Sequence, residues 1–207
     1  MEPQMVDSKR TSSASATALA QILGTSAVDV EIDGKRLSLA ISVDRAEHER
    51  RQAASMGAVT STGTLHGLWL LPYGGTVPEL DVPPHKRDRL RSEPGWVRKG
   101  PGGLQRLYSP AGVVTAAAVT RARSVEALRI ASALPPIMER YVVLNEPSKE
   151  LTADARKAGV GVIANGAEPR IVAEPQECVT GRPAVYRWWI AEIAYEQWLQ
   201  LNAQPVS

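Results

Sequence analysis

The sequence predicts an α/β protein in which mixed sheets are flanked by helices. Two observations predict this class: a strand–helix–strand pattern that occurs twice, and a long C-terminal helix with a broad apolar face. The first copy of the pattern joins a strand at 37–43, a helix at 45–56 and an apolar strand that ends at Pro72. The second joins a strand at 113–120, a helix at 125–134 and a strand at 141–144. The repetition predicts two related halves, which form either one interrupted sheet or two separate sheets.

The strongest local pattern is a hairpin in the first half. Apolar and polar residues alternate on both sides of Asp33-Gly34, a pair typical of a two-residue type I′ turn. A two-residue turn fixes the register of the strands, because it decides which residues lie opposite each other. The cross-strand pairs expected are Val28 with Leu39, Val30 with Leu37, and Glu31 with Arg36.

Capping residues and helix-ending residues locate the other elements. Asp44 and Glu47 form a capping-box pattern before a helix. Ser124 and Ser148 stand where caps are expected before two later helices. The helices expected are 17–23, 45–56, 85–91, 125–134, 149–158 and about 184–201. The strands expected after the hairpin are 65–71, 104–108, 113–120, 141–144, 160–163 and 170–172.

Composition divides the chain into four segments. Residues 1–16 are polar and of low complexity, so a disordered tail is expected there. Residues 83–103 are rich in proline, glycine and charge, which predicts a basic linker or a binding segment. This segment separates an N-terminal α/β half at 17–82 from a C-terminal α/β half at 104–207, which ends in the tryptophan-rich helix.

Composition also excludes several classes of protein. The chain contains no apolar run near the ~18 residues that a membrane span requires, and its first residues lack the pattern of a signal peptide. A cytoplasmic protein that does not enter a membrane is therefore expected. The single cysteine, Cys178, has no partner for an internal disulfide, and the histidines are too far apart for a zinc site, so no cofactor is expected. The 18 arginines against 6 lysines indicate a GC-rich bacterium or its phage.

A stretch of the second half carries a family resemblance. Residues 115–128 have the pattern of a strand that leads into a helix, and 140–147 and 158–163 have the pattern of closing strands. This arrangement resembles restriction-endonuclease-like domains, the PD-(D/E)XK superfamily. In that family an Asp ends one strand, and an acidic-x-Lys triplet lies on the next. Here Ala118 and Thr120 stand at the positions of the triplet, so the resemblance implies a nuclease-like fold without catalytic residues.

The first half permits a weaker version of the same resemblance, with Asp29 on one strand and residues 40–42 on the next. A different hypothesis for this half is that Asp29, Glu31 and Asp33, spaced two residues apart, bind Mg²⁺ through their carboxylates. The alternative is a solvated strand face, because polar residues occupy every second position of any half-exposed strand.

The distribution of charge favours a nucleic-acid contact. Between residues 84 and 106 there are seven basic and two acidic side chains, whereas the whole chain carries a net charge of only +2. A basic segment with aromatic residues at its edges is typical of phosphate contacts with base stacking. The alternative is a hydrated linker. The candidate nucleic-acid-binding residues are Lys86, Arg87, Arg89, Arg91, Trp96, Arg98, Lys99 and Arg106.

The function expected from these patterns is that of a nucleic-acid-associated protein without enzymatic activity, built on a catalytically degenerate nuclease-like fold. One alternative is a protein-interaction or assembly module that docks a protein partner, or a second copy of the chain, through its C-terminal helix. Another is a metal-dependent nuclease with a rearranged site at Asp29, Glu31 or Asp33.

Overall fold

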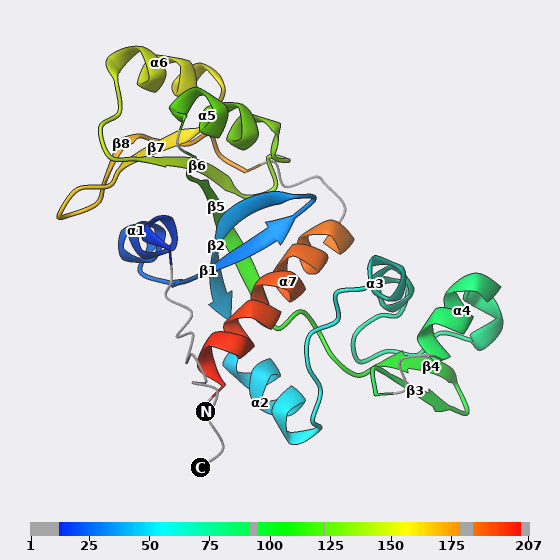
Figure 1. Cartoon of the computed structure of the whole chain (residues 1–207). Helices are drawn as coiled ribbons and strands as arrows, with labels where there is room; N and C mark the ends of the chain where they lie inside the picture. Colours follow the sequence, from blue (N-terminus) through cyan, green and yellow to red (C-terminus); the bar gives the residue numbers. More distant parts are fainter. Residues whose placement is uncertain (1–12, 92–94, 122, 179–183, 204–207) are drawn as a thin grey trace, which may run out of the picture.

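A computed structural model describes residues 13–91, 95–121, 123–178 and 184–203 of the chain (Figure 1). Its centre is a six-stranded mixed sheet with the strand order β1-β2-β5-β6-β7-β8. Strands β1, β2 and β5 are antiparallel, β5, β6 and β7 are parallel, and β8 is antiparallel to β7. The strands are β1 (Ser26–Ile32), β2 (Lys35–Val43), β5 (Gly112–Val119), β6 (Glu139–Leu144), β7 (Gly161–Ala164) and β8 (Arg170–Ala173).

The β1–β2 hairpin has the predicted register. Asp33 and Gly34 both have positive φ angles, 50° and 69°, which are the backbone angles that a type I′ turn requires. Val28 pairs with Leu39, Val30 with Leu37, and Glu31 with Arg36. The local turn chemistry therefore decides which side chains of the hairpin enter the core.

Helices cover both faces of the central sheet. Helix α1 (Ala14–Leu23) packs on the face that carries Ala40, Ala116 and Ala118. The opposite face packs against three helices and forms the largest apolar cluster of the described residues. These helices are α5 (Ser124–Ala133), α6 (Lys149–Lys157) and α7 (Ala184–Asn202).

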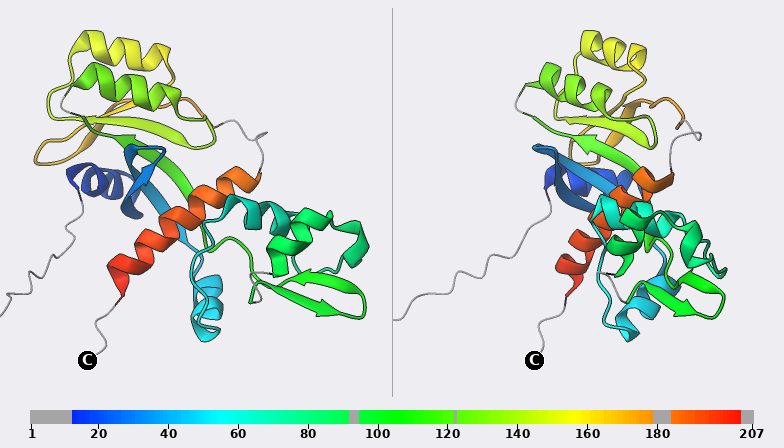
Figure 2. Two further views of the ribbon diagram at one scale, coloured as in Figure 1. Left: turned by 45° about the vertical axis from the view of Figure 1, so that its right-hand side comes forward. Right: turned by 90° about the vertical axis from the view of Figure 1, so that its right-hand side faces the viewer.

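Residues 59–108 form a lobe that extends away from the sheet (Figures 1 and 2). It follows α2 (Arg45–Ala53) and has an apolar core of its own, which includes Leu65, Leu68, Leu90 and Trp96. The N-terminal end of α7 contributes Val185 and Trp188 to this core. The elements of the lobe are α3 (Thr62–Trp69), the 3-10 turn η1 (Glu79–Asp81), α4 (Pro84–Arg91), β3 (Val97–Gly100) and β4 (Gly103–Arg106).

The strand predicted at 65–71 is wrong, because this segment forms helix α3. The side chain of Ser61 caps the helix by accepting a hydrogen bond from Thr64 N, and Leu65 and Leu68 point into the lobe from one side of it. A short apolar run fits a buried strand as well as a buried helix, so periodicity alone did not separate the two. The first strand–helix–strand copy is therefore absent. The second is present as β5, α5 and β6, and both halves contribute strands to one sheet.

Other predicted boundaries shift by a few residues. Helix α1 begins at Ala14 because the side chain of Ser13 caps it, so the end of the expected tail is helical, while residues 1–12 lie outside the described part. Helix α2 begins after the cap at Asp44, as predicted, but ends at Ala53. Helix α5 already includes Ser124, the residue expected to precede it as a cap. Ser148 caps α6 as predicted.

Helix α7 joins the lobe to the sheet. Its N-terminal part packs in the lobe core, and Ile190, Ala194 and Tyr195 pack in the core of the sheet. Most of the apolar face of α7, which the sequence indicated as an alternative docking surface, is thus covered within the chain. No helix in the described residues is long and apolar enough to cross a membrane.

Candidate nucleic-acid interface

The lobe core determines where the predicted basic residues lie. Leu90 on α4 and Leu104 on β4 are buried, and they orient the rest of both elements toward solvent. The basic residues come from three elements. They are Lys86, Arg87, Arg89 and Arg91 on α4, Arg98 and Lys99 on β3, and Arg106 on β4.

Two of these cations are bound to a carboxylate of the lobe. Glu79 forms ion pairs with Lys99 and, at 3.0 Å, with Arg91. Hydrogen bonds from Lys99 and from Arg91 hold the pKa of Glu79 below its ordinary value. The two pairs join η1, α4 and β3, so Arg91 and Lys99 contribute to the internal order of the lobe.

Other cations remain on the surface of the lobe. Arg98 is exposed, and Lys86 and Arg87 are partly exposed. No carboxylate of the described residues forms an ion pair with any of these three side chains. Arg89 is also exposed, and its side chain lies beside Gly63 on α3. This part of the lobe therefore presents positive charge to solvent.

Trp96 and Arg106 were predicted to lie on a nucleic-acid-binding surface, but the structure places both side chains in the interior of the lobe or at its junction with α7. Trp96 is only 3% exposed and packs edge to face on Tyr108 in the lobe core, so it cannot stack on a base without unfolding the lobe. The guanidinium of Arg106 lies 4.8 Å from the ring centre of Trp188, and burial lowers its pKa. Both residues therefore support the junction between the lobe and α7.

The sequence reasoning missed the aromatic side chains that the lobe exposes. Trp69 is 47% exposed and Tyr73 is 50% exposed, next to the cationic side chain of Arg50. Both residues lay in or near the run interpreted as a buried strand. Trp69 is the last residue of α3 and lies four positions after the buried Leu65, on the same face of the helix, so helical periodicity alone does not predict its exposure.

The strand positions that resemble a nuclease site open onto a cleft of about 880 Å³. We call it the serine cleft, because Ser13, Ser15 and Ser38 line it together with Asp29. Ser38 on β2 lies opposite Ala118 on β5, so the strand of the weaker resemblance in the first half and the strand of the resemblance in the second half are neighbours. Arg36, Thr120 and Arg121 also line the cleft.

Hydrogen bonds within the cleft engage its acidic residue. Asp29 accepts hydrogen bonds from Ser13 N at 2.8 Å, from Ser13 Oγ at 2.7 Å and from Ser38 Oγ at 2.7 Å. Glu31 lies opposite Arg36, and Asp33 belongs to the hairpin turn. Within the described part of the chain no three His, Cys, Asp or Glu side chains gather as a metal site would require.

His48 and Cys178 are two further side chains of chemically reactive types, and both lie outside the lobe and the serine cleft. His48 Nδ1 is 2.8 Å from Tyr195 Oη, and burial raises the pKa of Tyr195. Burial also raises the pKa of the Cys178 thiol, and the nearby charge of Glu139 raises it further. A thiol that stays protonated is a poor nucleophile, so the geometry does not favour Cys178 as a catalytic group.

Comparisons with family models, with curated proteins and with solved structures found no match for this chain.

Proposed function

We propose that this protein is a nucleic-acid-associated factor that binds the phosphate backbone through its lobe and does not cleave it. The observation that carries the proposal is the excess of positive charge on the lobe, which has seven basic and four acidic residues in a chain of net charge +2. Lys86, Arg87 and Arg98 are the cations best placed to contact phosphates, because no described carboxylate pairs with them. Tyr73 and Trp69 offer exposed rings on the same lobe.

The resemblance to nuclease-like domains supports the second part of the proposal. Helix α1 and the antiparallel strands β1 and β2 come first along the chain, and after α2 and the lobe come the antiparallel strand β5, the crossover helix α5 and the parallel strand β6. At the positions of the family's acidic and lysine residues stand Ala118 and Thr120, which supply neither a metal-binding carboxylate nor a cation beside a phosphate. A nuclease-like domain with these residues would bind a polynucleotide without hydrolysing it.

Salt-dependent binding tests the proposal. A fluorescent 20-mer duplex and a 20-mer of thymidine are each titrated with the parent chain and with the triple variant Lys86→Ser, Arg87→Ser, Arg98→Ser. Each phosphate contact releases counterions and makes log K fall more steeply with log salt. Loss of three contacts is therefore expected to make the slope on the duplex less negative by about 2 to 3. Binding at low salt should weaken by at least about tenfold.

The matched control removes three exposed cations from α5 and α6 with the triple variant Arg129→Ser, Lys149→Ser, Lys157→Ser. It changes the net charge by the same amount but leaves the lobe intact, so its salt slope should match that of the parent. Equal weakening in both triple variants would show a general charge effect and refute the lobe as the interface. Absence of binding by the parent at low salt would refute the proposal as a whole.

A further inference from the structure

The first four residues of β5 lie along an edge of the sheet that no described strand covers. Strand β2 pairs with β5 from Gly112 onward. Strand β6 pairs with β5 only from Ala116, which lies opposite Glu139. On the β6 side, the backbone of residues 112–115 therefore has no partner strand among the described residues. An uncovered edge in the middle of a sheet is unusual, because backbone N–H and C=O groups there need hydrogen-bond partners.

The connection between α5 and β6 explains why the edge is uncovered. Pro135 and Pro136 follow α5, and Ile137 N donates a hydrogen bond to Pro135 O at 2.8 Å. This tight turn uses the residues that would otherwise extend β6 backward along β5, so β6 begins only at Glu139. Among the described residues this turn therefore accounts for the gap beside β5.

The edge also lacks the features that normally protect an exposed strand. Its four residues, Gly112, Val113, Val114 and Thr115, include no charge and no proline, whereas protected edges commonly carry one or the other. Val113 is 62% exposed despite its position on a strand of the central sheet. The register shift between Ala40 and Ile41 of the neighbouring strand leaves Thr115 as an extra residue in β5. Such bulges often re-aim side chains next to binding sites.

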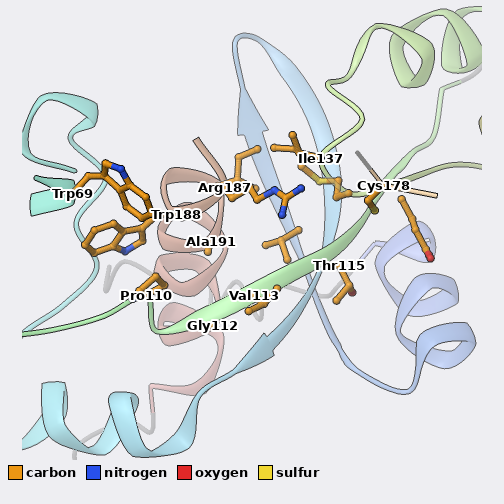
Figure 3. Close-up of a pocket in the computed structure, with 14 residues that line it drawn as sticks. Trp69, Pro110, Gly112, Val113, Thr115, Ile137, Cys178, Arg187, Trp188 and Ala191 are labelled. Carbon is orange, nitrogen blue, oxygen red and sulfur yellow. The ribbon is translucent and has the colours of Figure 1, made fainter. Parts of the chain in front are cut away.

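A cavity of about 520 Å³ lies beside this edge (Figure 3). Trp69 and Trp188 stand at one end of it and Ile137 and Cys178 at the other, with β5 running between the two ends. Its walls are mainly apolar. They are completed by Pro110 on the lobe side, by Met138 from the turn before β6, by Glu139 at the start of β6, and by Arg187, Ile190 and Ala191 from α7.

We propose that this edge and cavity bind an extended segment of a partner polypeptide, which adds to β5 as a strand in the row left open before β6. The edge without a partner strand identifies the class of partner, because only another extended backbone presents donors and acceptors at the spacing of a strand. The walls identify its side chains: alternate residues of the segment face the cavity and are apolar. Four residues of added strand span about 13 Å.

A small apolar molecule explains the observations less well. It would fill the cavity but leave the backbone groups of residues 112–115 that point away from β2 without a strand partner and shielded from water, at a cost comparable to a lost hydrogen bond for each such group. The proposed strand satisfies the backbone groups on the open side of β5 and buries Val113 and Trp69 at the same time. This inference does not depend on the nucleic-acid function of the lobe.

The test uses a capped probe peptide, acetyl-Lys-Thr-Val-Thr-Val-Thr-Lys-amide, and a second peptide of the same sequence with alternate backbone nitrogens methylated. The side chains of the two peptides are identical, so any difference in binding reports backbone hydrogen bonds. Amide NMR spectra of the intact chain, recorded up to about 1 mM peptide, give the affinity and locate the contact. The protein variants are Val113→Asp in the proposed site and, as the matched control, Val125→Asp on α5, where the side chain is 73% exposed.

The unmethylated peptide is expected to shift the amides of residues 112–115, and the methylated peptide to bind at least about tenfold more weakly. Val113→Asp should weaken binding by a similar factor, and Val125→Asp should leave it unchanged. Equal binding of both peptides, equal effects of the two Asp variants, or no binding at the highest concentration would overturn the proposal. If the parent chain dimerises in sedimentation and Val113→Asp makes it monomeric without any peptide binding, a second copy covers the edge and the proposed partner is wrong.

Discussion

Arg51 on α2 and Glu192 on α7 form a bidentate ion pair in the interior of the protein. The two Nη atoms of Arg51 each lie 2.8 Å from a carboxylate oxygen of Glu192, and both side chains are 0% exposed. Burial alone would lower the pKa of Arg51, but the hydrogen bonds and charges of Glu192 and Glu47 outweigh it and hold the pKa above its ordinary value.

The same pair holds the chain where it enters and leaves the lobe. Glu192 accepts a hydrogen bond from Val59 N at 3.0 Å, and Arg51 donates one to Ser109 O at 2.5 Å. Glu192 also accepts from Trp188 Nε1 at 2.8 Å. One buried network therefore attaches both connections of the lobe, at Val59 and Ser109, to the same turn of α7. It thereby determines how the basic side chains of the lobe are positioned relative to the sheet.

Replacement of Glu192 by Ala is expected to destabilise the protein by about 3 to 5 kcal/mol, because Arg51 would remain buried without its main counter-charge. Urea denaturation followed by far-UV circular dichroism measures the loss. The control is Asp154→Ala, which breaks an exposed pair with Lys157 and should cost less than about 1 kcal/mol. Equal losses in the two variants would show that the buried network does not stabilise the fold.

Trp188 is the second structural link between the lobe and the sheet. It is 2% exposed, and replacement by Ala is expected to cost about 3 to 5 kcal/mol through the cavity it leaves. Leu201, at the other end of α7, is 43% exposed, and Leu201→Ala should change stability by less than about 0.5 kcal/mol. Thermal unfolding of the two variants distinguishes an internal helix from a docking helix. A larger effect of Leu201→Ala, accompanied by loss of a dimer, would favour docking.

Local chemistry explains which parts of the fold the sequence predicted. The type I′ turn at Asp33-Gly34 fixes the hairpin register through two backbone angles, and caps such as Asp44 and Ser148 begin helices through one hydrogen bond each. These signals lie within a few residues of the elements they define. The strand β5, the helix α5 and the strand β6 also follow from patterns within a single stretch of chain.

Contacts between distant residues explain what the sequence did not predict. Trp96 looked available for stacking because its neighbours are charged, but it is buried under Arg51, whose guanidinium lies 4.5 Å from its ring centre. Glu79 binds two of the predicted basic residues from 12 and 20 positions away. Arg51 and Glu192 are 141 residues apart. No local pattern reports such pairings, because they depend on how α7 packs between the lobe and the sheet.

The pKa of Glu79 predicts a pH dependence of lobe stability. A carboxyl group whose pKa is lower in the folded state stabilises the fold above its unfolded pKa, about 4.3, and this contribution disappears as the pH falls through the folded value. The parent should therefore be more stable than Glu79→Gln at pH 6, and the difference should vanish in strong acid. Urea midpoints measured at each pH test this.

Asp81→Asn provides the matched control for that series, because Asp81 lies in the same 3-10 turn and forms none of the ion pairs of the described residues. Its difference from the parent should not follow the pH profile of Glu79→Gln. A profile shared by the two variants would assign the effect to the overall charge of the lobe rather than to the pairs with Lys99 and Arg91.

Asp29 is expected to stabilise the start of α1 rather than to bind a metal ion. Asp29→Ala removes the acceptor of two hydrogen bonds from Ser13, the cap of α1, and should cost about 1 to 2 kcal/mol. Glu31→Ala, two positions along β1, should change stability by less than about 0.5 kcal/mol. In the parent, Mg²⁺ or Mn²⁺ should neither raise the melting temperature nor produce cleavage of a duplex or a single strand, because the hydroxyl and backbone groups around Asp29 already use its oxygens. Metal-dependent cleavage that Asp29→Ala abolishes, with the variant still folded, would instead establish a rearranged nuclease site in the serine cleft.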